Sequence, residues 1–267
     1  MSASPLATPL PWDLVSSAYN EEVVPQLAHF AREALRLAAA PPGSRVVDVA
    51  CGPGTLAFLA ASAGHRVDAI DFSPEMLSYL DARALREGND RITSQLGDGQ
   101  ALPYADATFG AAFSMFGLMF FPDRAAGFRE LRRVLVPGAR AVVSSWPQLE
   151  EHPVFTPMFE AISAALGSQP SPRSAPLATE DACNAEMSAA FGGVEVHRIE
   201  HVERASSADE LWTRLSRTMA PLVLLRKNLG VRFAAVDEAA AAAIRTAVGA
   251  GPVELPMHAW LAVGVAV

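Results

Sequence analysis

Two glycines and an aspartate lie where an open α/β protein would hold a nucleotide-like ligand. The run Val46–Thr55, VVDVACGPGT, puts Gly52 and Gly54 on a turn between a predicted strand and a predicted helix. Because glycine has no Cβ, a ligand can approach this backbone and meet the exposed amides of the helix start. Asp71 follows 19 residues after Gly52, at the end of the next predicted strand, where a carboxylate can accept from ribose hydroxyls. This pattern also fits the relaxed dinucleotide fingerprint, so it leaves the kind of nucleotide open.

Three further sequence features help to identify which kind of nucleotide-like ligand the turn would hold. Asp48 lies inside the first strand, the third strand ends in Gly97–Gln100 (GDGQ), and Leu131–Gly138 (LRRVLVPG) leads into a fifth strand. Together with Asp71–Leu77 (DFSPEML), these motifs follow one another in a fixed order over residues 44–146. The chain therefore resembles the class I S-adenosylmethionine-dependent methyltransferases, in particular the small-molecule branch (type 11) that includes the ubiquinone and menaquinone biosynthesis enzymes.

The resemblance implies S-adenosylmethionine as the cofactor and a role for each matching residue. Asp48 would reach the ammonium group through water or an amide, Asp71 would accept from both ribose hydroxyls, and Asp98 would accept from the adenine amine. Ala50 and Cys51 stand where many relatives have glycine or another small residue, which removes no side chain that the ligand needs. The implied cofactor-binding residues are Tyr19, Asp48, Ala50, Gly52, Gly54, Asp71, Phe72, Met76, Asp98, Gly99, Gln100, Ser114 and Met115.

Strand and helix patterns alternate along the chain, which favours a doubly wound α/β fold. With the resemblance, they predict a Rossmann-like, mostly parallel seven-stranded sheet with helices on both faces and a helical lid. No internal repeat or composition break argues for a second independent domain. We expect one domain over 1–267: an N-terminal helical cap (1–43), a cofactor-binding core (44–146), substrate-side lid insertions (147–193 and 203–255) and a final strand (256–267).

An apolar cluster at the carboxyl ends of the fourth and fifth strands would suit an apolar or aromatic acceptor. Phe120 and Phe121 belong to this cluster, although each could equally be core beneath the following helix. Residues 211–225 would form a lid between the last two strands or, alternatively, a face for a homodimer. The predicted substrate-pocket residues are Phe116, Met119, Trp146, Trp212 and Met219.

Methyl transfer depends mainly on aligning the acceptor, the methyl group and the sulfur and on excluding water, and a strong base is optional. If the acceptor requires deprotonation, the candidate catalytic residues are His152, after the fifth strand, and Tyr19. The alternative for His152 is a surface loop. We expect Cys51 to be a small packed residue rather than a nucleophile, and Glu130, Arg132 and Arg133 to lie on a solvated helix face.

Composition excludes several other function classes. The chain has 21 basic and 29 acidic residues, a net charge of −8, and no run of five like charges, so we expect no nucleic-acid partner. The longest apolar run, 109–121, is 13 residues, too short for a membrane span. With no export signal at the amino terminus, no metal-ligating cluster and only Cys51 and Cys183, a cytoplasmic enzyme acting on a small molecule is expected.

Three alternatives remain open at this point. A nicotinamide-dependent oxidoreductase would share the first turn but would have no use for Asp98. A non-catalytic protein could bind S-adenosylmethionine as a scaffold or regulatory partner. A relative with the same fold could use the sulfonium for a reaction other than methyl transfer.

Overall fold

The computed structural model describes residues 4–168 and 175–267, which form a seven-stranded sheet of order β3-β2-β1-β4-β5-β7-β6. Strands β1 to β5 are parallel, β7 is antiparallel to β5, and β6 is antiparallel to β7. The mostly parallel, doubly wound fold that the sequence predicts is therefore confirmed. The strands are β1 (Arg45–Val49), β2 (Arg66–Asp71), β3 (Ile92–Leu96), β4 (Phe109–Met115), β5 (Leu135–Ser145), β6 (Gly192–Ala205) and β7 (Val253–Val265).

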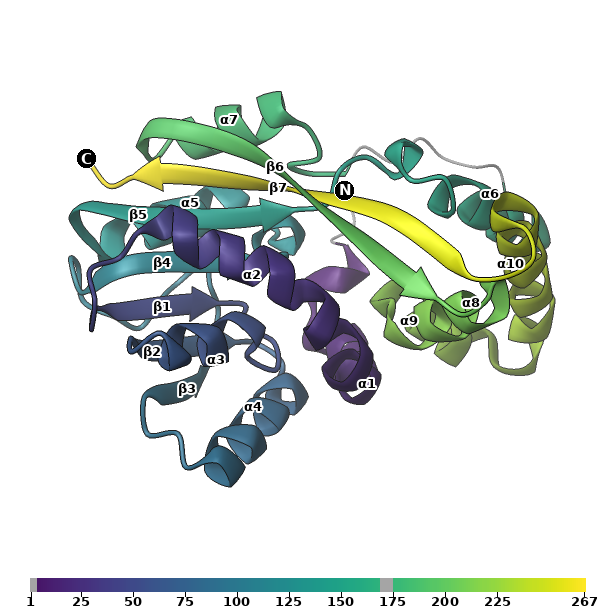
Figure 1. Ribbon diagram of the computed structural model, residues 1–267, viewed down its shortest axis with the longest axis horizontal. Coiled ribbons are helices and arrows are strands. Elements are labelled where there is room, and N and C mark those ends of the chain that lie inside the picture. The colour runs from purple at the N-terminus through teal and green to yellow at the C-terminus, as the bar shows by residue number, and fades with distance from the viewer. Residues whose placement is uncertain (1–3, 169–174) are drawn as a thin grey trace.

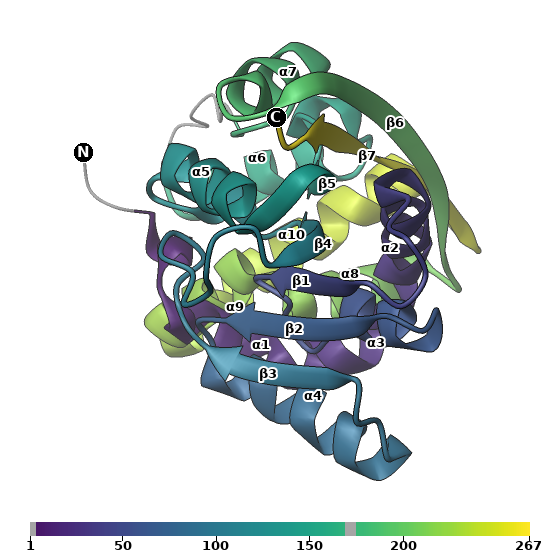
Figure 2. The same ribbon diagram turned by 90° about the vertical axis from the view of Figure 1, so that its left-hand side faces the viewer.

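Helices cover both faces of this sheet (Figure 2). On one face, α2 and α3 bury apolar side chains against β1, β2, β4, β5 and β7. On the other face, α5 and α7 do the same, with Phe128 and Met187 fully buried. The helices are α1 (Pro9–Ala18), α2 (Val24–Ala38), α3 (Thr55–Ser62), α4 (Pro74–Glu87), α5 (Arg124–Val134), α6 (Phe155–Ala165), α7 (Glu180–Ser188), α8 (Ala208–Thr218), α9 (Ala220–Leu229) and α10 (Phe233–Val248).

Strand β1 lies between β2 and β4, where the strand order reverses. Its residues 46–49 are all buried, because it has neighbouring strands on both sides and helices on both faces. In an open α/β sheet, the crevice at such a reversal is the usual place for a ligand, just beyond the carboxyl ends of the strands.

The last two strands are long, and they extend from the sheet toward a separate group of helices (Figure 1). Helices α6, α8, α9 and α10 share a hydrophobic core with the far ends of β6 and β7. Leu211 and Trp212, from the segment predicted as a lid or dimer face, are buried inside this core. Helix α7, within the predicted lid segment 147–193, instead packs against the sheet. Positions 169–174 of that segment, and 1–3 of the predicted cap, lie outside the described residues.

The proline-containing amino-terminal lead is helical. Pro5 and Pro9 each stand at the start of a helix, where the missing N–H is not needed: the 3₁₀ turn Pro5–Ala7 and α1. A π-helical turn, Tyr19–Val23, joins α1 to α2. No helix in the described part of the chain has the length and apolar character to cross a bilayer.

Candidate active site

Left-handed backbone conformations shape the turn that follows β1. Ala50, Gly52 and Gly54 have φ angles of +57°, +53° and +90°. Such angles strain a residue with a side chain, so Ala50 is held there by its surroundings. A Cβ on Gly54 would lie 3.0 Å from Leu80, so this glycine also allows α3 and α4 to pack closely.

The turn after β4 is equally constrained. Phe116 has a φ of +58°, and its amide donates a hydrogen bond to the Ser144 hydroxyl at 2.9 Å. The Ser114 hydroxyl accepts from the Leu118 amide at 3.1 Å. A Cβ on Gly117 would lie 2.3 Å from the Cβ of Ala50, so the turns after β1 and β4 approach each other at a position that requires glycine.

Two buried carboxylates lie beside the β1 turn. The Gly52 amide donates to one oxygen of Asp71 at 2.8 Å, and the Ser73 amide donates to the other at 2.9 Å. Asp48 is 1% exposed, and neither of its carboxylate oxygens has a hydrogen-bond partner among the described residues. A buried carboxylate without a partner is costly, which makes Asp48 the unsatisfied group of this site.

The surroundings of both carboxylates disfavour their charged forms. Burial, reinforced by the charge of Asp71, raises the pKa of Asp48 to about 7, and the backbone of Ala57 opposes this rise. Burial also raises the pKa of Asp71 to about 6, against the opposing hydrogen bonds from Ser73 and Gly52. A cationic ligand group at this position would favour ionisation of Asp48.

The loop after β3 brings Asp98 to the same crevice. The Gln100 amide group donates to Asp98 at 3.0 Å, and its oxygen accepts from the Asp123 backbone amide at 2.8 Å. A Cβ on Gly99 would lie 2.5 Å from Phe121 and 2.7 Å from Val49, so the loop packs against the sheet only with glycine there.

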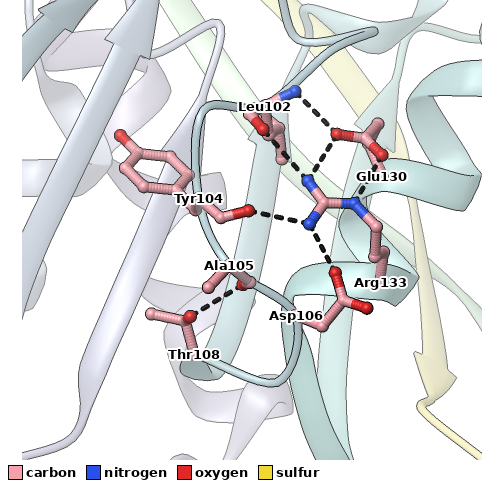
Figure 3. A network of polar contacts seen from close by, with 7 residues as sticks. All are labelled: Leu102, Tyr104, Ala105, Asp106, Thr108, Glu130 and Arg133. Atoms are coloured by element: carbon pink, nitrogen blue, oxygen red, sulfur yellow. Dashed lines mark hydrogen bonds and ion pairs between the residues drawn. The ribbon is translucent and has the colours of Figure 1, made fainter.

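Arg133 on α5 binds the part of this loop that follows Gln100, residues 102–106 (Figure 3). Its guanidinium group donates to the carbonyl oxygens of Leu102 and Tyr104, and it pairs with Asp106 and Glu130. Glu130 in turn accepts from the Leu102 amide at 2.7 Å, and these contacts lower its pKa. Glu130 and Arg133 were expected on a solvated helix face, but the loop folds over them and leaves both only partly exposed.

These turns and the amino-terminal helices enclose a cavity of about 220 Å³. Polar groups from the ends of β1, β2 and β3 line one part, and apolar side chains from η1 (Pro5–Ala7), α1, α2 and the β4 turn line the rest. The lining residues are Leu6, Ala7, Trp12, Tyr19, Leu27, Ala31, Asp48, Ala50, Cys51, Gly52, Pro53, Thr55, Leu56, Asp71, Phe72, Met76, Gly97, Asp98, Gly99, Gln100, Met115, Phe116, Gly117, Phe120, Phe121 and Pro122.

The structure brings nearly all of the predicted cofactor residues to this cavity. Gly54 and Ser114 are the members of the predicted set that do not line it. Gly54 acts through helix packing and Ser114 through the β4 turn. Tyr19 lines the cavity, and burial together with the nearby charge of Asp71 raises the pKa of its hydroxyl, so the hydroxyl is protonated at neutral pH. Cys51 is buried and burial raises the pKa of its thiol, which fits the packed role predicted for it.

Of the predicted substrate-pocket residues, Phe116 lines the cavity and the others lie elsewhere. Trp146 stacks behind Phe116, with ring centroids 4.1 Å apart, and supports it. Met119 is in the core between the sheet and α5. Trp212 and Met219 pack with the hydrophobic core that α6, α8, α9 and α10 share. There the Trp212 indole donates to Asp237 at 3.1 Å.

His152 does not line the cavity either. It is 2% exposed and packs against Phe155 and His258. Burial, and to a smaller degree the neighbouring His258, lowers its pKa to about 4. The surface-loop alternative is wrong, because the loop after β5 turns this side chain inward.

Trp12 is a cavity residue that the sequence alone did not indicate. Its indole N–H donates to the Leu6 carbonyl at 2.9 Å, and its ring meets Phe120 edge to face at 5.1 Å. A proline at the start of α1 was the available signal for a helix here. Phe120 and Phe121, for which core and pocket roles were both open, pack against the core and also line the cavity.

Comparison with known proteins points to one family. Residues 46–138 match the family model described as "Methyltransferase domain". An uncharacterized protein of Mycobacterium tuberculosis is 43% identical over 105 residues, 39% of this chain and 38% of that protein. The 2-phytyl-1,4-naphtoquinone methyltransferase of Synechococcus elongatus is 39% identical over 131 residues, 48% of this chain and 54% of that protein. The chain thus spans about half or less of the length of these relatives.

Among solved structures, the [4+2]-cyclase SpnF superposes with a TM-score of 0.62 at 19% identity and covers all of both chains. At that identity the likeness concerns the fold. The family model matches the part of the chain that carries the motifs at the ends of β1, β2 and β3. Residues 46–138 therefore form a class I methyltransferase domain, as their resemblance to the S-adenosylmethionine-dependent family predicted.

Proposed function

We propose that this protein transfers a methyl group from S-adenosylmethionine to an oxygen or nitrogen atom of a small, apolar or aromatic acceptor. The observation that carries the proposal is Asp48: a buried, unpartnered carboxylate at a glycine turn, facing a cavity. An ammonium group such as the one on the methionyl end of S-adenosylmethionine would satisfy it, either directly or through water.

The other cavity residues fit the remaining parts of the cofactor. Asp71 has oxygen lone pairs left to accept from ribose hydroxyls, beyond the two amide bonds that orient it. Asp98, held by Gln100, would accept from the adenine amine, and Met76 and Phe72 would cover the ring. When bound, S-adenosylmethionine supplies a methyl group that its sulfonium has already activated.

The rest of the cavity supports an apolar acceptor. Its wall beyond the cofactor residues is made of side chains such as Leu27, Trp12 and Phe120. These side chains would exclude water and align a flat ring for in-line displacement. Because His152 is outside the cavity and the Tyr19 pKa is raised, neither predicted base suits proton abstraction, so the accepting atom would bring its own lone pair, as an ionised aromatic hydroxyl does. The naphthoquinone named for the Synechococcus relative has such a flat ring.

A screen of aromatic hydroxy compounds and amines with S-adenosylmethionine would test this activity. We expect mass spectrometry to find acceptors that gain one methylene unit in mass, and Asp98→Ala to need a higher concentration of S-adenosylmethionine for the same gain. If S-adenosylmethionine binds but is converted without any methylated product, the non-methylating alternative is supported instead. If NADH binds and S-adenosylmethionine does not, the oxidoreductase alternative is supported.

A further inference from the structure

The segment that follows β2 contacts both parts of the cavity. The Ser73 amide donates to Asp71, one of the proposed cofactor residues, at 2.9 Å. The hydroxyl of the same residue donates to the Asp13 carboxylate on α1 at 2.5 Å and accepts from the Met76 amide at the start of α4. Ser73 is fully buried, and its bonds to Asp71 and the Met76 amide are buried with it, whereas its bond to Asp13 is part-buried. One residue therefore joins the cofactor side of the cavity to the amino-terminal helix.

Apolar packing follows the same path. Val15 on α1 is buried against Met76 on α4 and Ala220 on α9, with Trp12 and Tyr19 at the edge of this cluster. Met76 itself lines the cavity at the place proposed for adenine. Helix α1 therefore packs on a residue that the cofactor would contact, through Val15, two residues after Asp13.

Two features of α1 bear on its local stability. Its connection to α2 is the π-helical turn Tyr19–Val23, and such turns are rare and frequently occur at functional sites. Apart from Val15, Ser16, Pro11 and Ala18, its side chains are partly or fully exposed, and Leu10 and Leu14 are 45% and 37% exposed. Six of its ten residues are thus at least partly exposed, and elements with fewer buried contacts open locally more readily than the core does.

We propose that Asp13 is a positioning residue that couples the cofactor site to the acceptor site. Through Ser73, occupation of the cofactor site holds α1 in place, and α1 then presents Trp12 as the aromatic wall that selects a flat acceptor. The acceptor site is therefore complete only when the cofactor is bound. This inference rests on the proposed function, because it assumes that the polar part of the cavity is the cofactor site.

Two properties follow from the coupling. Cofactor binding slows the opening of α1, and the cofactor and an acceptor-like ring increase each other's affinity by the same factor. Loss of the Asp13 hydrogen bond removes both effects and leaves the polar contacts of Asp48, Asp71 and Asp98 with the cofactor in place.

Hydrogen–deuterium exchange of residues 9–18, with and without saturating S-adenosylhomocysteine, tests the first property. In the wild type, we expect S-adenosylhomocysteine to slow exchange at least fivefold. In Asp13→Ala the slowing falls below twofold, and Asp13→Asn restores it because the amide oxygen still accepts from Ser73. Ser17→Ala, on the exposed face of α1, is the matched control and behaves as the wild type.

Calorimetry with 2-naphthol, a small flat aromatic alcohol, tests the second property. We expect wild-type protein to bind 2-naphthol at least fivefold more tightly with S-adenosylhomocysteine present, Asp13→Ala to lose this difference, and Trp12→Ala to bind 2-naphthol weakly in both states. Equal coupling in the wild type and Asp13→Ala, no rescue by Asp13→Asn, or no binding of 2-naphthol to the complex would each overturn the proposal. Failure of wild-type protein to bind S-adenosylhomocysteine at all would instead overturn the proposed function.

Discussion

Replacing Asp48 by asparagine should make the ligand-free protein more stable and less able to bind its cofactor. Asparagine keeps the shape of the side chain and removes the charge that burial opposes. Because the pKa of Asp48 is raised from 3.8 to about 7 on folding, the folded protein binds this proton more tightly than the unfolded chain does. The stabilising effect of the proton is therefore complete below pH 3.8 and is lost as the pH rises through 7.

The size of the effect follows from those two pKa values. Their difference, about 3, multiplied by about 1.4 kcal/mol per pKa unit, sets an upper limit of about 4 kcal/mol on the cost of the ionised carboxylate at pH 8. An asparagine amide buried without partners carries its own cost of about 1 to 3 kcal/mol. We therefore expect Asp48→Asn to raise the free energy of unfolding at pH 8 by roughly 1 to 3 kcal/mol, and to lose most of this advantage at pH 5.

Chemical denaturation of the ligand-free protein at pH 5, 6.5 and 8 measures this effect, and calorimetry with S-adenosylhomocysteine measures affinity. Asp90→Asn, which changes an exposed aspartate, is the control and should alter neither quantity. The reasoning would be refuted if Asp48→Asn were less stable than the wild type at pH 8, or if it bound S-adenosylhomocysteine equally well.

Three further substitutions test other parts of the structure. Asp98→Ala should weaken S-adenosylhomocysteine binding by roughly 1 to 3 kcal/mol, because polar ligand groups would lose a partner; equal affinity by calorimetry would exclude this role. Arg133→Ala should lower the free energy of unfolding by about 1 to 3 kcal/mol, since it leaves the Leu102 and Tyr104 carbonyl groups without their donor. The control Arg129→Ala should leave this free energy unchanged. Equal denaturation midpoints for the two variants would contradict the role of Arg133 in holding the loop. His152 has its pKa lowered on folding, so the wild type should lose roughly 1 to 2 kcal/mol of stability between pH 7 and pH 5 that His152→Leu does not lose; parallel pH profiles would contradict its burial.

The sequence indicated well which residues meet at the polar part of the cavity, because its signals are local. Gly52 and Asp71 each stand at the end of a buried strand, and parallel strands bring such ends together at one edge of the sheet. Helix and strand patterns place those ends without any knowledge of tertiary contacts. Most of the predicted cofactor residues therefore line the cavity.

The apolar part of the cavity depends on contacts between distant segments, which the pattern of one chain does not reveal. Trp12 reaches the cavity because α1 packs between α4 and α9. The large aromatic side chain of Trp212 would suit a pocket, but α8 turns it toward α10 and away from the crevice. Arg133 and Glu130 have the spacing of an exposed ion pair, and their role depends on a loop that begins over thirty residues earlier.

The most direct test of the central claim is a crystal structure of the protein with S-adenosylhomocysteine. We predict the amino group within hydrogen-bond reach of Asp48, directly or through one water, the ribose hydroxyls on Asp71, and the adenine between Met76 and the Asp98–Gln100 loop. The same ligand bound outside the cavity, or inside it with Asp48 still unpartnered, would contradict the account.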